Sequence, residues 1–140
     1  MSIAAALPGG RRRPFDGLAA PALVREDVAV ATEDDARAIA LSLPETTERP
    51  SYGTPGFRVK DKLFARIREP GVLLVRVSDE GEKDFLLRAD PAKFFTTPHY
   101  DGHPSILVRL DAVDRDELGE LLADAWRARA PKRLADALDA

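Results

Sequence analysis

The fold is decided by two strand-like runs, Phe57-Arg-Val-Lys-Asp-Lys-Leu-Phe-Ala-Arg-Ile-Arg68 and Val72-Leu-Leu-Val-Arg-Val77. They are separated by Glu69-Pro-Gly71, which is a strong turn signal. A further turn is expected near Lys60-Asp-Lys62, inside the first run. Adjacent runs joined by short turns are typical of antiparallel strands, so this part of the chain predicts a β-hairpin.

One face of this hairpin is predicted to be apolar and the other basic, because side chains alternate across a strand. The apolar face is expected to hold Phe57, Val59, Leu63, Ala65, Ile67, Leu73, Val75 and Val77. The opposite face is expected to hold Arg58, Lys60, Phe64, Arg66, Arg68, Val72, Leu74 and Arg76, with Arg109 as a further candidate. Phe64 could stack on a base there, or pack under the arginine stems.

The charge of the hairpin opposes that of the molecule. Between Arg58 and Arg76 there are six basic residues and two acidic ones, a local charge of +4. The whole chain carries −3, so the remainder carries −7. A cationic patch within an anionic protein favours a polyanionic partner.

Composition places the chain among single-domain globular proteins. Its 140 residues, 44% hydrophobic and 32% charged, are enough for one domain with its own core. The sequence has no cysteine, which excludes disulfides, thiolate metal sites and cysteine nucleophiles. No apolar run approaches the roughly 20 residues of a membrane-spanning helix. The arginines at 11–13 follow the short apolar start instead of preceding it, so no secretion signal is predicted and a cytoplasmic location is expected.

Residues 1–31 are predicted to be a disordered tail, because they contain three prolines and three glycines and no sustained period. The single domain is expected over 32–140. A helix is predicted from Thr32, the cap, to Pro44, which ends it. Residues 45–56 are expected to be extended and turn-rich, with Pro50 and Pro55 preventing a central strand.

The remaining elements complete an α+β domain. A helix over 79–90 is predicted to face inward with Phe85, Leu86 and Ala89. Strands are expected at 94–97 and 105–110, around the loop 98–104. A helix over 115–130 has an apolar stripe of Leu118, Leu121, Leu122, Ala125 and Trp126, and residues 132–138 are expected to add a short helix. The element order predicts an antiparallel sheet covered by helices on one face and open on the other.

The sequence resembles the MmcQ/YjbR-like proteins over roughly residues 33–136. The resemblance is carried by Leu41-Ser-Leu-Pro44, Ser51-Tyr-Gly-Thr-Pro-Gly-Phe-Arg-Val59, Lys62-Leu-Phe-Ala-Arg66, Phe94-Phe-Thr-Thr-Pro-His-Tyr100, Leu107-Val-Arg-Leu110, Ala125-Trp126 and Ala130-Pro-Lys-Arg-Leu134. It implies a compact α+β fold similar to the frataxin/CyaY type. It also implies a "double wing" arrangement proposed to bind DNA.

Three further groups of residues are weighed as sites. Tyr52, His99 and Tyr100 could line a small pocket, or the rings could anchor their loops. His99 and His103 flank Asp101, but no further histidine or cysteine completes a tetrahedral metal shell. No P-loop, HExxH, GxGxxG or Ser-His-Asp order is present, so neither catalysis nor a cofactor is predicted.

The leading hypothesis is a non-enzymatic DNA-binding protein that contacts phosphates through its basic sheet face. The candidate contacts are Arg58, Lys60, Lys62, Arg66, Arg68 and Arg76. One alternative is a protein- or peptide-interaction module on the same sheet, with Phe64, Val72 and Leu74 as its apolar contacts. The other is a small-anion-binding domain built around the tyrosine pocket.

Overall fold

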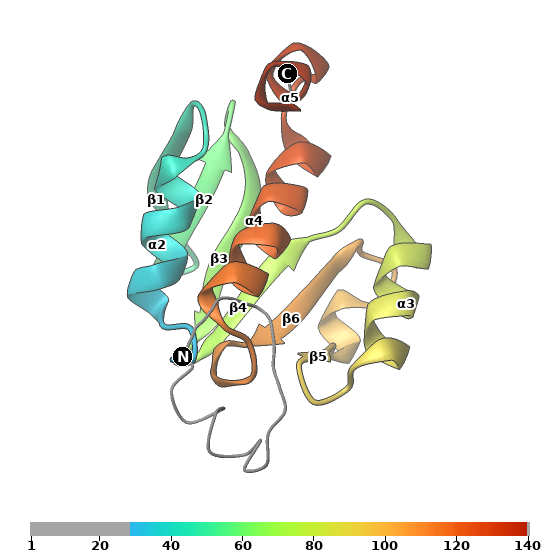
Figure 1. The fold of residues 1–140 in the computed structure, drawn as a ribbon. Coiled ribbons are helices and arrows are strands. Elements are labelled where there is room, and N and C mark those ends of the chain that lie inside the picture. The colour runs from blue at the N-terminus through green and yellow to red at the C-terminus, as the bar shows by residue number, and fades with distance from the viewer. Residues whose placement is uncertain (1–28, 140) are drawn as a thin grey trace, which may run out of the picture.

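The computed structural model describes residues 29–139 and shows a six-stranded antiparallel sheet with the strand order β1-β2-β3-β4-β6-β5 (Figure 1). The strands are β1 (Thr46–Ser51), β2 (Thr54–Val59), β3 (Lys62–Glu69), β4 (Val72–Arg76), β5 (Phe94–Phe95) and β6 (Ser105–Arg109). The helices are α2 (Glu33–Ser42), α3 (Glu80–Ala89), α4 (Arg115–Arg129) and α5 (Lys132–Asp139), with the short 3₁₀ turns η1 (Pro98–Tyr100) and η2 (Leu110–Ala112). The predicted α+β class is confirmed.

Helix α2 begins where the sequence predicts. The Thr32 hydroxyl accepts a hydrogen bond from the Asp35 N–H, and the Asp35 carboxylate accepts one from the Thr32 N–H, both at 3.1 Å. This capping box satisfies two backbone donors that the first turn of a helix leaves unpaired. The helix ends at Ser42, two residues before Pro44.

Helices α2 and α4 cover one face of the sheet and form the core with it (Figure 1). The predicted stripe of α4 is buried at Leu118, Leu122, Ala125 and Trp126, while Leu121 is half-buried. The Trp126 indole donates a hydrogen bond to the Pro44 carbonyl oxygen at 3.0 Å. This bond fixes the end of α2 against α4 and satisfies the one polar group of a fully buried ring.

Helix α3 forms where predicted, but its inward face differs from the expectation. Phe85 is 65% exposed and Ala89 is exposed, whereas Leu86 and Leu87 pack partly against the core and Lys83 is buried. Figure 1 shows α3 beside the β5 edge of the sheet, away from α2 and α4. A helix at an edge buries a narrower stripe than one lying across the sheet, so the apolar spacing placed Phe85 and Ala89 wrongly.

The expectation that Pro50 and Pro55 prevent a central strand is wrong. They lie opposite each other in the β1–β2 hairpin, and β2 is an interior strand. Each proline stands at a place in the sheet where its missing N–H costs little stability. Pro50 is on the edge strand β1, and the pairing of β2 with β3 starts at Gly56, one residue after Pro55.

The folded domain begins earlier than predicted. Val30 forms an isolated antiparallel bridge with Asp114, and the buried Ala31 donates its N–H to the Val113 carbonyl oxygen at 2.9 Å. Residues 30 and 31, which the sequence assigns to the tail, therefore belong to the domain. The rest of the predicted tail, up to residue 28, lies outside the described residues. Within residues 29–139, no helix has the length and apolar character needed to cross a membrane.

Candidate functional site

The candidate site is the sheet face that α2 and α4 leave uncovered, which we call the open face. Residues paired across antiparallel strands point to the same side, so the register defines which side chains share it. Gly56 pairs with both Arg49 and Arg66, and Arg66 pairs with Leu74. Following the register across the sheet places five arginines on the open face: Arg49, Arg58, Arg66, Arg76 and Arg109. Arg68 has no register partner, because the β3–β4 pairing is irregular between Ile67 and Glu69, but its guanidinium lies 6.0 Å from the Tyr100 ring on the same face.

Acidic side chains are scarce on this face. The six strands contain two acidic residues, Glu48 and Glu69. Glu48 pairs in register with the buried Phe57 and forms an ion pair with Arg37 of α2 at 2.8 Å, on the helix-covered side. Glu69 lies at the end of β3, with its carboxylate 3.9 Å from Arg68. Asp61, in the β2–β3 turn, forms an ion pair with Arg49 of β1 at 3.1 Å. The excess positive charge of the open face therefore comes from β2, β3, β4 and β6.

A β-bulge in β3 moves Phe64 to the other side of the sheet. Phe57 pairs with Ala65 but Arg58 pairs with Leu63, so Phe64 is an extra residue between two pairs. Its side chain joins the main core and is 1% exposed. The expectation that Phe64 lies among the arginines is wrong, because strict alternation fails at a bulge.

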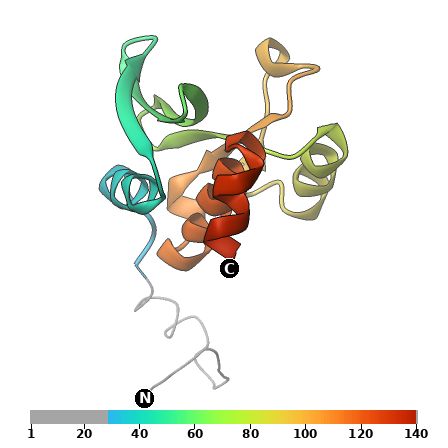
Figure 2. The same ribbon diagram turned by 90° about the horizontal axis from the view of Figure 1, so that it is seen from above.

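Two projections flank the open face. Figure 2 shows the β1–β2 hairpin and the segment around residue 100 rising on the side opposite α2 and α4. The first ends in a two-residue turn in which Tyr52 and Gly53 have φ values of 54° and 80°. The second contains η1, and buried Lys83 donates hydrogen bonds to the Tyr100 and His103 carbonyl oxygens at 2.7 and 2.9 Å.

Arg66 joins the two projections at the centre of the open face. It is 8% exposed and donates hydrogen bonds to the Thr54 hydroxyl at 3.2 Å and to the Tyr100 hydroxyl at 3.3 Å. Its guanidinium carbon lies 5.1 Å from the centroid of the Tyr52 ring. The guanidinium carbon of Arg68 lies 6.0 Å from the Tyr100 ring. We call Tyr52, Thr54, Arg66, Arg68 and Tyr100 the Arg66 cluster.

The proposed tyrosine pocket is thus brought together in part. Tyr52 and Tyr100 meet at Arg66, although they are far apart in the sequence. His99 is exposed and contacts Tyr100 edge to face, with 4.8 Å between ring centroids. Among residues 29–139, no group of three or more acidic, histidine or cysteine side chains is arranged to hold a metal ion.

The other arginines of the open face extend the cluster toward β6. Arg109 stacks 4.2 Å from the centroid of the Phe95 ring and donates a hydrogen bond to the Pro91 carbonyl oxygen at 3.1 Å. Arg76 pairs in register with Ser105. Burial lowers the pKa of Arg76 from its ordinary value, and the nearby charge of Arg129 adds to this effect.

Several of these guanidiniums hold donors that the protein does not satisfy. The Nε atoms of Arg58, Arg68 and Arg76 are buried and have no hydrogen-bond partner among the described residues. Buried polar groups in native proteins are nearly always paired with protein, water or ligand. Three such donors on one cationic face favour anions or ordered water above it.

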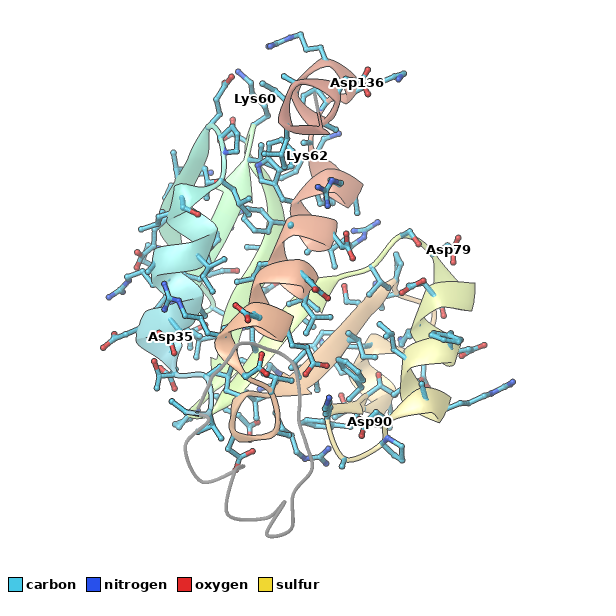
Figure 3. The ribbon with its side chains drawn as sticks, viewed as in Figure 1. Asp35, Lys60, Lys62, Asp79, Asp90 and Asp136 are labelled. Carbon is cyan, nitrogen blue, oxygen red and sulfur yellow. The ribbon has the colours of Figure 1, made fainter. Side chains whose placement is uncertain are left out.

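Lys60 and Lys62 do not join the open face. Both lie at the tip of the β2–β3 hairpin, beside α5 (Figure 3). Lys60 forms an ion pair with Glu45 at 2.5 Å, and the hydrogen bond from Lys60 lowers the pKa of the Glu45 carboxyl. Lys62 pairs in register with Val59, which belongs to the core side. Of the six predicted basic contacts, the structure gathers Arg58, Arg66, Arg68 and Arg76.

Sequence reasoning missed three residues that shape the site: Arg49, Thr54 and Lys83. Arg49 was hidden by the expectation of an irregular segment around Pro50. A β1–β2 hairpin could have been found from Tyr52-Gly53, a turn dipeptide between two short extended runs. No sequence signal marks Lys83 as buried, because its partners are backbone carbonyls of a distant segment.

A family model described as YjbR matches residues 41–128, which include the β1–β2 hairpin, the open face and most of α4. The chain belongs to the YjbR family. Uncharacterized proteins of Mycobacterium bovis and Mycobacterium tuberculosis are each 39% identical to this YjbR protein over 126 residues. The match covers 77% of this chain and 95% of each relative.

The fold of this YjbR protein is similar to a crystal structure of a Deinococcus radiodurans protein with a DUF419 domain. The TM-score is 0.60 at 27% sequence identity, and the match covers 70% of this chain and 78% of that chain. The predicted resemblance is confirmed at the level of family and fold. Because fold does not fix function, the activity is argued from this chain's own residues.

Proposed function

We propose that this YjbR protein is a non-enzymatic nucleic-acid-binding protein that holds phosphates on its open face. The proposal rests on the six arginines from five strands on one side of the sheet, five of them placed by register and Arg68 by its contact with Tyr100. Guanidinium groups match the geometry of phosphate oxygens and form two parallel hydrogen bonds with them. Their spread over a whole face suits a polymer of phosphates better than a single small anion.

The unpaired Nε donors of Arg58, Arg68 and Arg76 support the same function. A phosphate oxygen at each would satisfy a buried donor. The net charge of −3 opposes non-specific attraction at long range, so binding is expected to depend on this face and to be weak. The contacts are expected to be largely independent of base sequence.

A protein- or peptide-binding role receives less support. Phe64 belongs to the core and is not available for contact. Leu74 and Leu107 are buried beneath Tyr100, and Val72 and Phe95 pack against them. The apolar side chains of the open face are thus largely used within the molecule.

Fluorescence anisotropy with labelled duplex DNA, single-stranded DNA and RNA tests the proposal. Binding in the micromolar range is expected at about 20 mM salt. Contact with four to six phosphates predicts that log affinity falls against log salt with a slope of roughly −4 to −5.

The decisive variant is the double charge reversal Arg58→Glu/Arg68→Glu, because both side chains are half-exposed and neither is a core residue. The matched control is Arg88→Glu/Lys132→Glu, which changes the net charge equally at exposed positions on α3 and α5. We expect the first variant to lose binding and the control to keep it. Equal binding by both variants, or no binding at low salt, would reject the proposal. Arg66 is unsuitable for this test, because its reversal would bury a carboxylate.

A further inference from the structure

The Arg66 cluster contains a buried positive charge that no carboxylate balances. Arg66 is 8% exposed, and its hydrogen-bond partners among the described residues are the hydroxyls of Thr54 and Tyr100. Burying a charged group is unfavourable unless it is paired and hydrogen-bonded. Two neutral acceptors satisfy part of the guanidinium and leave its charge uncompensated. An anion bound here would therefore be stabilised more strongly than one at an exposed arginine.

The hydroxyl groups around Arg66 are oriented by the bonds they already make. The Thr54 hydroxyl accepts from Arg66 and donates its hydrogen to the Ser51 carbonyl oxygen at 3.0 Å. The Tyr100 hydroxyl also accepts from Arg66, but its own hydrogen has no acceptor among the described residues. Tyr100 therefore retains an O–H donor beside the guanidinium. Together with Arg68, whose guanidinium lies near the same ring, this gives three donors suited to one phosphate.

Tyr52 adds an aromatic surface to the same place. Its side chain is 91% exposed, although its ring lies close to the buried Arg66 guanidinium. It occupies a left-handed turn position with φ 54°, where a bulky side chain is unfavourable and asparagine or glycine is usual. The exposed ring contributes almost no packing in return for this conformation. An unfavourable conformation without a packing benefit motivates a search for a ligand contact.

We infer that the Arg66 cluster is a nucleotide subsite that selects single-stranded over double-stranded nucleic acid. One phosphate lies between Arg66, Arg68 and the Tyr100 hydroxyl, and the adjacent base stacks on the Tyr52 ring. The faces of a base inside a duplex are covered by its neighbours, so an isolated exposed ring stacks with an unpaired base. This inference rests on the proposed function and deepens it by naming the strand state of the ligand.

The test compares three labelled oligomers of about 12 nucleotides on the full chain by anisotropy: oligothymidylate, an abasic strand of equal length, and a blunt duplex. Abasic and thymidine strands carry the same phosphates and differ in the base. We expect oligothymidylate to bind about 5- to 140-fold more tightly than the abasic strand, the range that one base–aromatic stack provides. Tyr52→Ala should remove this difference, and Tyr52→Phe should keep it. Abasic and duplex affinities should not change in either variant.

Two results separate this inference from the proposed function. If oligothymidylate and the abasic strand bind equally and Tyr52→Ala changes neither, while Arg58→Glu/Arg68→Glu abolishes both, the stacking subsite is rejected and phosphate binding stands. If no oligomer binds at low salt, both are rejected. Competition with thymidine monophosphate tests whether a free nucleotide, which carries the same phosphate and base, is the ligand of this subsite. Displacement of the oligomer by an equal concentration of the mononucleotide would show a free-nucleotide site and overturn the selection of a strand.

Discussion

The ammonium group of Lys83 lies 2.7 Å from the backbone carbonyl oxygen of Tyr100, and both residues are buried. A second hydrogen bond from the same group reaches the His103 carbonyl oxygen. Through these bonds, α3 holds the projection that carries Tyr100 beside the open face. The position of the Tyr100 hydroxyl at Arg66 therefore depends on a lysine that contacts neither Arg66 nor the open face directly.

Lys83→Met should destabilise the protein by about 1–3 kcal/mol, because it removes the hydrogen bonds that a buried ammonium group donates to the Tyr100 and His103 carbonyl oxygens. Denaturant unfolding measures the free energy change. Faster amide hydrogen exchange in residues 98–104 would show that the loss of stability lies in that segment. Arg88→Met on the same helix is the control, since Arg88 is exposed. Equal stability of the two variants would show that the Lys83 bonds do not hold the segment.

Phe64→Ala should be among the most damaging single substitutions, with a loss of about 3–5 kcal/mol, because the bulge places the ring in the core. Phe85→Ala removes the same atoms from a ring that is 65% exposed and should change stability by at most about 0.5 kcal/mol. Thermal and denaturant unfolding of the pair make the comparison. A small loss of stability in Phe64→Ala would contradict the placement of this ring in the core.

Gly56→Ala should lower stability by about 1–3 kcal/mol, because β1 approaches β2 closely at this residue. An added Cβ would lie 3.0 Å from both the Arg49 carbonyl oxygen and the Ser51 Cβ. Gly119→Ala in α4 is the opposite case, since its added Cβ meets nothing within 4 Å and alanine favours helix by up to about 1 kcal/mol. Denaturant unfolding should show a lower free energy of unfolding for Gly56→Ala and an unchanged or higher one for Gly119→Ala. An unchanged value for Gly56→Ala would argue against the close approach of the two strands.

The ion pair between Lys93 and Glu117 should make stability depend on pH in the alkaline range. The two groups lie 2.9 Å apart, and the hydrogen bond to Glu117 raises the pKa of Lys93 above its ordinary value of 10.5. A raised folded-state pKa means that the stabilisation is complete below the unfolded pKa and disappears as pH rises through the folded one. Unfolding midpoints of wild type and Lys93→Met should therefore converge as the pH rises beyond 10.5 and through the raised pKa of Lys93. Parallel curves would contradict this linkage.

Local patterns predicted the helices well. These predictions depended only on residues that lie close together in the chain. They concerned the capping box of Thr32 and Asp35, the apolar stripe of α4, and the turns after Val59 and Glu69. These features could therefore be predicted without knowledge of any tertiary contact. The same local reading failed for Phe85, because its exposure depends on where α3 lies relative to the sheet.

The candidate site was predicted in outline and not in detail. Alternation in β3 and β4 indicated a basic face, and Arg58, Arg66 and Arg76 lie on it by register. Arg68 lies on it by its contact with the Tyr100 ring. Lys60 and Lys62 were separated from it by the hairpin turn, since alternation does not continue through a turn. Phe64 lies on the opposite side of the sheet, in the core, because of the bulge in β3.

The sequence by itself determined the fold class and the ends of the helices, because capping, proline and apolar spacing act over short distances along the chain. The tertiary structure alone decided that Arg66 is buried between Thr54 and Tyr100 and that Tyr52 remains exposed beside it. Strand register, a bulge in β3 and the anchoring of a distant segment by Lys83 set those positions. These are contacts between residues far apart in the chain, and no local preference encodes which of them will meet.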